Sequence, residues 1–138
     1  MHLNSLYLFV ADLPKTIDFY RQLGLKIEVV SEWLARADCG NGVLLEFGTA
    51  ELTRSYDPSW TPPAPQAKGT INFTLDSREA VDELYQRMIN AGHAGHLAPC
   101  DPPWEARFAI LRDPDGNHVG LHSPRSLDAD RRRERGEA

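Results

Sequence analysis

Hydrophobic and polar positions follow the same order in two stretches of the chain. Each stretch begins with an alternating run of period two, at residues 3–10 and 70–75, which predicts a strand. An amphipathic run of period 3.6 follows in each, at residues 12–24 and 76–92, and predicts a helix packed on the sheet. A repeated unit of this kind implies two half-domains that close one curved sheet around a shared cleft, with the helices outside.

Turn residues and apolar runs place the remaining elements. Further strands are expected at residues 26–31, 33–38, 43–48, 107–111 and 117–123. Asp12 is suited to cap the first helix and Gly24 to end it, and Asp76–Glu79 predicts a capping box for the second helix. The glycine-rich segment that carries His93 and His96 is expected to be an exposed turn.

The chain is predicted to form one domain built from two modules. The expected division is a first βαβββ module at residues 1–48, an arm at 49–68, a second βαβββ module at 69–124 and a flexible charged tail at 125–138. Prolines at positions 58, 62, 63 and 65 favour an extended and rather stiff arm, because proline blocks both helix and sheet.

The composition argues against several classes of partner. A chain of 138 residues with a formal charge of −5 has no strongly basic character suited to nucleic acid or an anionic membrane. No apolar stretch is long enough to span a membrane and no export signal is recognised, so a cytoplasmic location is expected. Cys39 and Cys100 form no close-spaced motif and are expected to remain thiols.

Several short motifs occur in an order that is specific to a family. They are Leu8–Leu13, Asp18–Tyr20, Leu23–Gly24, Pro103–Trp104 and Asp113–Asn117. Together they resemble the vicinal oxygen chelate superfamily, which includes glyoxalase I, extradiol dioxygenases, fosfomycin-resistance enzymes and bleomycin-resistance proteins. The resemblance implies an α+β fold of paired βαβββ modules. It also implies a curved mixed sheet around a cleft, helices on the outer face, and usually a homodimer.

The family's metalloenzymes take their ligands from the first and last strands of each module. The resemblance carries these positions onto Ser5, Glu46, Thr70 and Gly120. Only Glu46 binds metal well, because neutral hydroxyls are poor ligands and glycine has no side chain, so neither a metal nor another cofactor is expected. The alternative is a displaced site made of Glu46 with His118 and His122, which share one face of their strand.

Strand parity predicts a polar and aromatic lining for the cleft. The side chains expected there are Ser5, Tyr7, Phe9, Glu46, Thr70, Asn72, Thr74, His118 and His122. Trp33, Trp60 and Trp104 lie near loops and offer flat faces that stack on planar rings. The predicted ligand-binding residues are therefore Tyr7, Trp33, Glu46, Trp60, Asn72, Trp104, His118 and His122. No catalytic residue is assigned.

Two functions are weighed, with a third behind them. The first hypothesis is a metal-free protein, most similar to the bleomycin-resistance branch, that sequesters an aromatic or polycyclic compound such as an antibiotic. The alternative is a lyase, isomerase or dioxygenase with a displaced metal site, or with Glu46 as general base. A protein-binding pseudo-enzyme is the third. The identity of the ligand stays open, as does whether the modules pair within one chain or swap between the chains of a homodimer with grooves at its interface.

Overall fold

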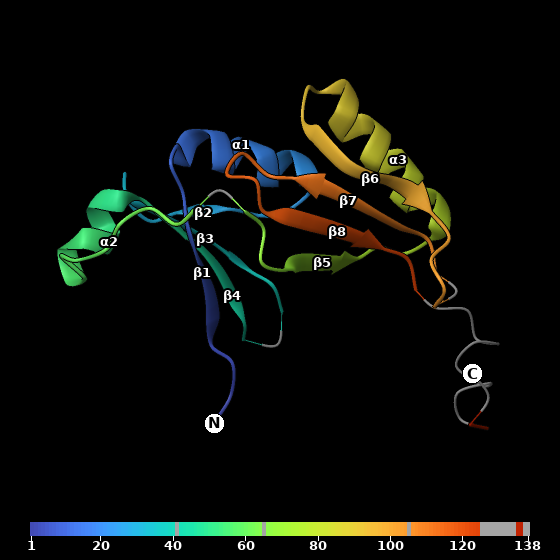
Figure 1. Cartoon of the computed structure of the whole chain (residues 1–138), viewed down its shortest axis with the longest axis horizontal. Helices are drawn as coiled ribbons and strands as arrows, with labels where there is room; N and C mark the ends of the chain where they lie inside the picture. Colours follow the sequence, from blue (N-terminus) through green and yellow to red (C-terminus); the bar gives the residue numbers. More distant parts are fainter. Residues whose placement is uncertain (41, 65, 105, 125–134, 137–138) are drawn as a thin grey trace. The chain divides into compact units, whose positions relative to one another are not determined.

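The computed structural model describes residues 1–40, 42–64, 66–104, 106–124 and 135–136. The chain divides into two compact units, Met1–Gln66 and Ala67–Ala138. Both contain a strand, a helix and three further strands, the βαβββ order expected from the sequence (Figure 1). The predicted tail lies outside the described residues except for positions 135 and 136. No helix in the described part of the chain is long and apolar enough to cross a membrane.

The first unit is a four-stranded mixed sheet with a helix on one face. Its elements are β1 (Ser5–Phe9), α1 (Leu13–Leu23), β2 (Glu28–Val29), β3 (Leu34–Asp38), β4 (Leu44–Gly48) and α2 (Ala50–Tyr56). The strands lie in the order β1-β4-β3-β2, with β1 parallel to β4 and the other pairs antiparallel. Asp12 caps α1 and Gly24 ends it with φ 120°. Tyr20 stacks on Phe47 with ring centroids 4.7 Å apart, which joins the helix to the sheet.

The second unit repeats this arrangement. Its elements are β5 (Thr70–Thr74), α3 (Arg78–Asn90), β6 (Ala94–Cys100), β7 (Phe108–Arg112) and β8 (His118–His122). The strands lie in the order β5-β8-β7-β6, with β5 parallel to β8 and the other pairs antiparallel. One face of the sheet packs on α3 and buries the apolar side chains of both, namely Val81, Leu84, Met88, Ala109, Leu111, Val119 and Leu121.

The predicted α+β class is confirmed, but the arm differs from its prediction. It is not extended throughout, because α2 occupies Ala50–Tyr56 at its start. The side chain of Thr49 caps this helix by accepting a hydrogen bond from the backbone N–H of Leu52. All the prolines of the arm come after the helix, so they do not prevent it.

Two details of the second unit also differ from the sequence expectation. The segment after α3 is strand β6 and not a turn, because it pairs antiparallel with β7 across two register shifts. His96 therefore lies on a strand, although it is exposed as expected. The N-cap of α3 is Ser77 and not Asp76, since the Ser77 hydroxyl accepts from the backbone N–H of Ala80. Cys39 and Cys100 are free thiols.

Candidate functional site

Two predicted ligand-binding residues of the first unit, Tyr7 and Glu46, lie on the sheet face opposite α1. The helix-facing side chains of β3 and β4 are buried, and the alternate residues point the other way. The strand register aligns four side chains in one row across the sheet, namely Tyr7, Glu46, Arg36 and Glu28. A carboxylate thus lies between a phenol and a guanidinium.

Glu46 is the acidic group at the centre of this row. Its neighbour Arg36 donates two hydrogen bonds to Glu28, at 3.0 and 3.3 Å, and these bonds hold the pKa of the Glu28 carboxyl below its usual value. Within the described part of the chain, no group donates a hydrogen bond to the half-buried Glu46 carboxylate. Its oxygens are therefore open to a hydrogen-bond donor or a proton of a ligand.

Tyr7 joins the row to helix α2. Its hydroxyl shares a hydrogen bond of 3.2 Å with Thr53 Oγ1, in which either oxygen can donate. Burial raises the pKa of Tyr7, and the hydrogen bond with Thr53 opposes that rise. A Cβ at position 48 would coincide with the Tyr7 hydroxyl, so the side chain can cross β4 only because residue 48 is glycine.

An aromatic cluster surrounds Tyr7. Its ring contacts Phe9 at 5.6 Å and Tyr56 at 6.5 Å between centroids, and Phe9 in turn contacts Trp60 at 5.1 Å. The guanidinium of Arg54 lies 5.3 Å from the centre of the Trp60 ring, a cation–π contact. Two predicted residues, Tyr7 and Trp60, are thus brought into one cluster through side chains contributed by β1 and α2.

Trp33 is not part of this cluster. It precedes β3 and is 40% exposed, and its carbonyl accepts a hydrogen bond from the backbone N–H of Thr49. No ring contact joins it to another aromatic side chain among the described residues. The structure therefore leaves Trp33 separate from the other predicted residues of its unit.

In the second unit, Trp104 and His122 form a direct pair. The indole Nε1–H donates to His122 Nε2 at 2.7 Å, and the two ring planes differ by only 9°. Phe108 lies opposite His122 in the β7–β8 register and contacts both rings. Phe108 was not predicted as a site residue. Counting back from the Asp-Pro-Asp-Gly hairpin turn would have paired it with His122.

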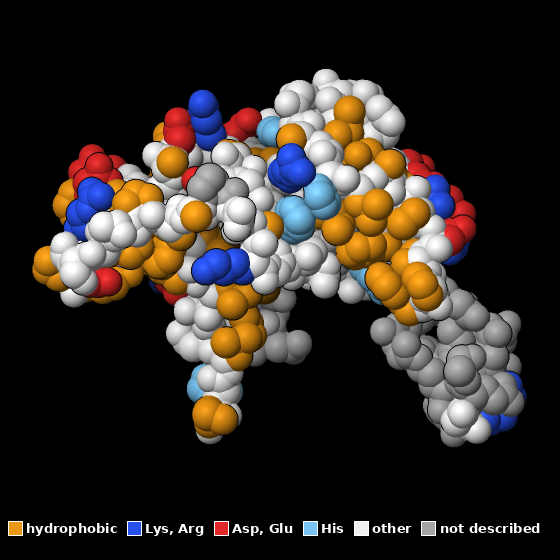
Figure 2. Space-filling model, viewed as in Figure 1, with side chains coloured by type: hydrophobic (Ala, Val, Ile, Leu, Met, Phe, Trp, Pro, Cys, Tyr) orange, Lys and Arg blue, Asp and Glu red, His pale blue; other side chains and the backbone are white. Residues whose placement is uncertain are grey.

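His118 belongs to a second group on the same strand. Its ring stacks on His96 of β6 with centroids 4.1 Å apart, and Arg112 donates to His96 Nδ1 at 2.8 Å. Desolvation lowers the pKa of His96, and the charges of His118 and Arg112 lower it further. Figure 2 shows histidine side chains beside a Lys or Arg side chain over this unit, with hydrophobic side chains next to them.

Asn72 lies beside Gly120 at the centre of the second sheet. The two residues are register partners on the parallel strands β5 and β8. A Cβ at position 120 would coincide with Asn72 Oδ1, so the amide fills the space that a side chain on Gly120 would need. The predicted residue Asn72 is thus exposed, with its amide over the glycine of the neighbouring strand.

The donor set does not fit the metal centre of the family's metalloenzymes. The space beside Gly120 is filled by the Asn72 amide, and the Nε2 lone pair of His122 is occupied by the Trp104 N–H. Ser5 and Thr70 offer neutral hydroxyls, which are weak ligands. Among the described residues, no group of three or more His, Cys, Asp or Glu side chains is arranged to hold a metal ion.

Comparisons with known proteins agree with the fold. The sequence model of the Glyoxalase/Bleomycin resistance protein/Dioxygenase superfamily matches residues 2–121. The chain is 30% identical over 129 residues to the uncharacterized protein YraH of Bacillus subtilis (strain 168), covering 88% of this chain and 98% of YraH.

Two solved structures extend the likeness. A glyoxalase/bleomycin resistance protein/dioxygenase family enzyme from Burkholderia phytofirmans PsJN is 26% identical, with a TM-score of 0.74 over 89% of this chain and 98% of that one. Lactoylglutathione lyase from Agrobacterium tumefaciens is 22% identical, with a TM-score of 0.67 over 88% and 92%, and shares the fold. From the family match, the relative and the fold, this chain belongs to the Glyoxalase/Bleomycin resistance protein/Dioxygenase superfamily.

Proposed function

We propose that the protein sequesters a flat aromatic or polycyclic compound, such as an antibiotic, by stoichiometric binding without a metal. The observation that carries this proposal is the exposure of clustered aromatic side chains in both units. Phe9 is 38% exposed, Tyr56 63% and Trp104 37%, although each contacts other rings. Such rings combine a large apolar area with little entropy to lose, so they are well suited to stack on a planar ligand.

The proposal places the protein nearest to the bleomycin-resistance branch. It includes a homodimer in the cytoplasm, with ligand grooves at the subunit interface. Gly120 offers no metal ligand, and Nε2 of His122 already accepts a hydrogen bond from Trp104. Both facts favour ligand binding over metal-dependent turnover. Sedimentation of the purified protein tests the dimer, and a monomer that binds ligand with full stoichiometry would contradict the interface grooves.

Tryptophan fluorescence with calorimetry tests the binding itself. The probes are bleomycin, the anthracycline daunorubicin and the acridine 9-aminoacridine. We expect at least one of them to quench the tryptophan emission in a saturable way, with a fixed number of ligands per chain. The variant Trp104→Ala should lose part of the quenching. Absence of both quenching and heat with a broad panel of planar compounds would overturn the proposal.

A second candidate function rests on Glu46. Its carboxylate lies beside the Tyr7 phenol with open acceptor oxygens, a suitable position for a metal-free general base. The named activity of one structural relative, a lactoylglutathione lyase, makes formation of lactoylglutathione the first assay to run. Glu46→Gln should abolish any turnover found, whereas Glu28→Gln, in the same row, should not. Full activity of Glu46→Gln would exclude this role.

A further inference from the structure

The Trp104–His122 pair has an unusual geometry for two aromatic rings. The ring centroids are 6.3 Å apart and the planes are nearly parallel, yet the two rings are joined by a hydrogen bond of 2.7 Å. An indole N–H and an imidazole lone pair both lie in the planes of their rings. The rings therefore lie edge to edge in nearly one plane, and do not stack face on face.

The hydrogen bond also sets the state of His122. The indole of Trp104 can only donate, so Nε2 of His122 must be the acceptor and its proton must lie on Nδ1. Both members of the pair are flat rings, and each offers a face that can stack on an aromatic ligand.

Phe108 contacts both rings of the pair edge-on. Its centroid lies 5.6 Å from Trp104 and 5.8 Å from His122, at interplanar angles of 66° and 67°. Nearly equal distances and angles mean that a single side chain contacts both members of the pair. Trp104 nevertheless keeps 37% of its surface exposed, so the pair is supported without being covered.

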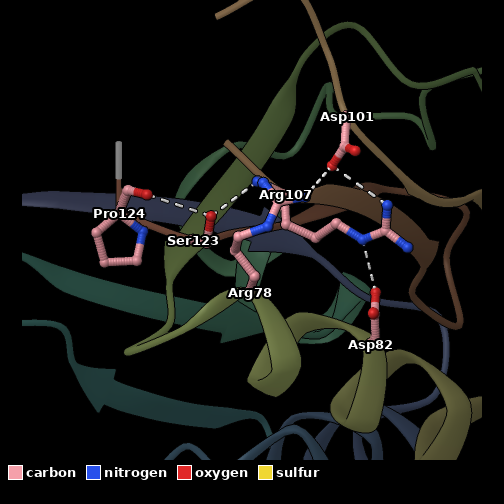
Figure 3. Close-up of polar contacts among 6 residues, drawn as sticks. All are labelled: Arg78, Asp82, Asp101, Arg107, Ser123 and Pro124. Atoms are coloured by element: carbon pink, nitrogen blue, oxygen red, sulfur yellow. Dashed lines mark hydrogen bonds and ion pairs between the residues drawn. The ribbon is translucent and has the colours of Figure 1, made fainter. Parts of the chain in front are cut away.

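Ion pairs hold the ends of the loop that carries Trp104. Asp101, just after β6, contacts both Arg78 of α3 and Arg107, just before β7 (Figure 3). Arg107 also donates to Asp82 of α3 at 2.8 Å. The two ends of the loop are therefore joined to each other and to one helix.

Ser123 ties the same loop to the end of β8, next to His122. The backbone N–H of Arg107 donates to Ser123 Oγ at 2.7 Å (Figure 3). The N–H of Ser123 donates to the Arg107 carbonyl at 2.9 Å. Ser123 is fully buried. The end of the loop that follows Trp104 is thus joined to the end of the strand that carries His122 before a ligand arrives, which reduces the ordering cost of binding.

We propose that Trp104 and His122 together form one elongated flat platform that stacks a ligand of three or more fused rings. This inference rests on the proposed binding function and specifies its ligand class. A ligand of one or two rings is covered by the indole alone, whereas a third fused ring extends over the imidazole. Thr74, the exposed β5 partner of His122, and Asn72 offer hydrogen bonds to substituents of such a ligand.

Matched probes that differ by one fused ring test the platform. The cations 4-aminoquinoline and 9-aminoacridine form one pair, and the anions naphthalene-2-sulfonate and anthracene-2-sulfonate form another, so ring number is separated from charge. Calorimetry on the full chain should show about tenfold tighter binding of the three-ring member of at least one pair.

Two substitutions at His122 separate the ring from the hydrogen bond. His122→Ala removes both, whereas His122→Gln keeps an oxygen that can accept from Trp104 but removes the aromatic surface. Both variants should lose the preference for three rings, so that the two members of each probe pair bind with similar affinity. His93→Ala, a histidine outside the platform, is the control and should keep the preference. The indole N–H signal of Trp104 in a ¹H–¹⁵N spectrum should shift in His122→Ala.

The outcomes distinguish a failure of the platform from a failure of the binding function. If the probes bind and the variants keep the preference for three rings, the platform inference is wrong while the binding function stands. If no probe and no compound of the broader panel binds, the proposed function fails first. An unchanged Trp104 N–H signal in a folded His122→Ala variant would show that the rings are not joined and would also overturn the inference.

Discussion

The two units share one topology but differ in what occupies the centre of the sheet. In the first unit a glutamate, Glu46, faces a tyrosine on the parallel neighbouring strand. In the second unit the same register position is Gly120, and Asn72 from the parallel strand fills its space. The repeated topology therefore fixes which positions are register partners. The residue at the central position then decides whether a carboxylate is available there, as with Glu46, or a neighbouring amide fills the space, as with Gly120.

Glycine has a related steric role in both units, although the side chain it admits differs. Gly48 admits the rigid ring of Tyr7, whereas Gly120 admits the end of the flexible Asn72 side chain. The first side chain is held by Thr53 and by other rings. The second is exposed. The first unit should consequently tolerate the loss of its glycine much less well than the second.

Replacing the two glycines gives the largest expected effect. Gly48→Ala should destabilise the protein by about 2 kcal/mol, because the Tyr7 ring must leave its place against α2. Gly120→Ala should cost less than about 1 kcal/mol, because Asn72 can turn away toward solvent. Urea unfolding measures both. Equal losses would show that the two positions are packed alike, and the double variant Gly48→Ala with Tyr7→Ala should lessen the steric clash in the first unit.

The stabilities of the two units are expected to respond differently to a fall in pH. In the second unit the pKa of His96 lies below its ordinary value, so as pH falls the unfolded chain takes up this proton first and stability declines. The row of the first unit contains Glu28, whose pKa is also lowered, by its hydrogen bond from Arg36. Its contribution is complete above the unfolded carboxyl pKa and is lost only as pH falls through the lower folded value.

NMR titration of the His96 and Glu28 side chains measures this difference. Arg112→Met should raise the pKa of His96, because it removes a neighbouring positive charge, and should make the second unit less sensitive to mild acid. Arg36→Met should leave the pKa of His96 unchanged and raise that of Glu28. A His96 pKa that does not move in Arg112→Met would contradict the contact between the two side chains.

The ion pairs that hold the Trp104 loop should give a smaller effect. The hydrogen bond from Arg78 holds the pKa of Asp101 below its usual value, so this pair stabilises the fold above the unfolded pKa of about 3.9 and ceases to do so as pH falls through the folded value. Arg78→Ala should raise the pKa of Asp101 and slightly lower the unfolding midpoint at neutral pH. Exposed ion pairs contribute little, so a large loss would mean that the loop has another role.

Neither unit is expected to bind a metal ion. Elemental mass spectrometry after incubation with Zn, Ni, Mn or ferrous iron, followed by desalting, should find far less than one ion per chain. The space beside Gly120 and the occupied Nε2 of His122 are the reasons. A stoichiometry near one, lost in His122→Ala, would restore the displaced site of Glu46, His118 and His122.

Much of the fold could be predicted because its signals are local. Asp12 and Gly24 mark the ends of α1 by cap chemistry, and period-two runs place most strands. The helix α2 was missed because prolines later in the arm outweighed the cap signal of Thr49. Strand β6 was missed because its glycine and proline are weak strand formers, and it is stabilised by pairing with β7.

The site was harder to predict than the fold. The alternation of side chains along each strand was enough to predict the sheet faces of Tyr7, Glu46 and His122. Their neighbours on adjacent strands are set by the strand register. The hydrogen bond between Trp104 and His122 depends on a loop whose position is set by ion pairs to α3, and no local pattern reports such distant contacts. The role of Gly120 was predicted as a missing ligand. Its filling by Asn72 required the three-dimensional register.

The parallel pairing of first and last strands has a consequence for how the chain folds during synthesis. In each unit the first strand finds its partner only when the last one has been made, β4 for β1 and β8 for β5. The first unit can therefore close while the second is still being translated, but the second must wait for a strand that ends at His122. Until then β5 has no partner within its own sheet, and a ribosome stalled before residue 118 would leave this strand unpaired and prone to aggregate.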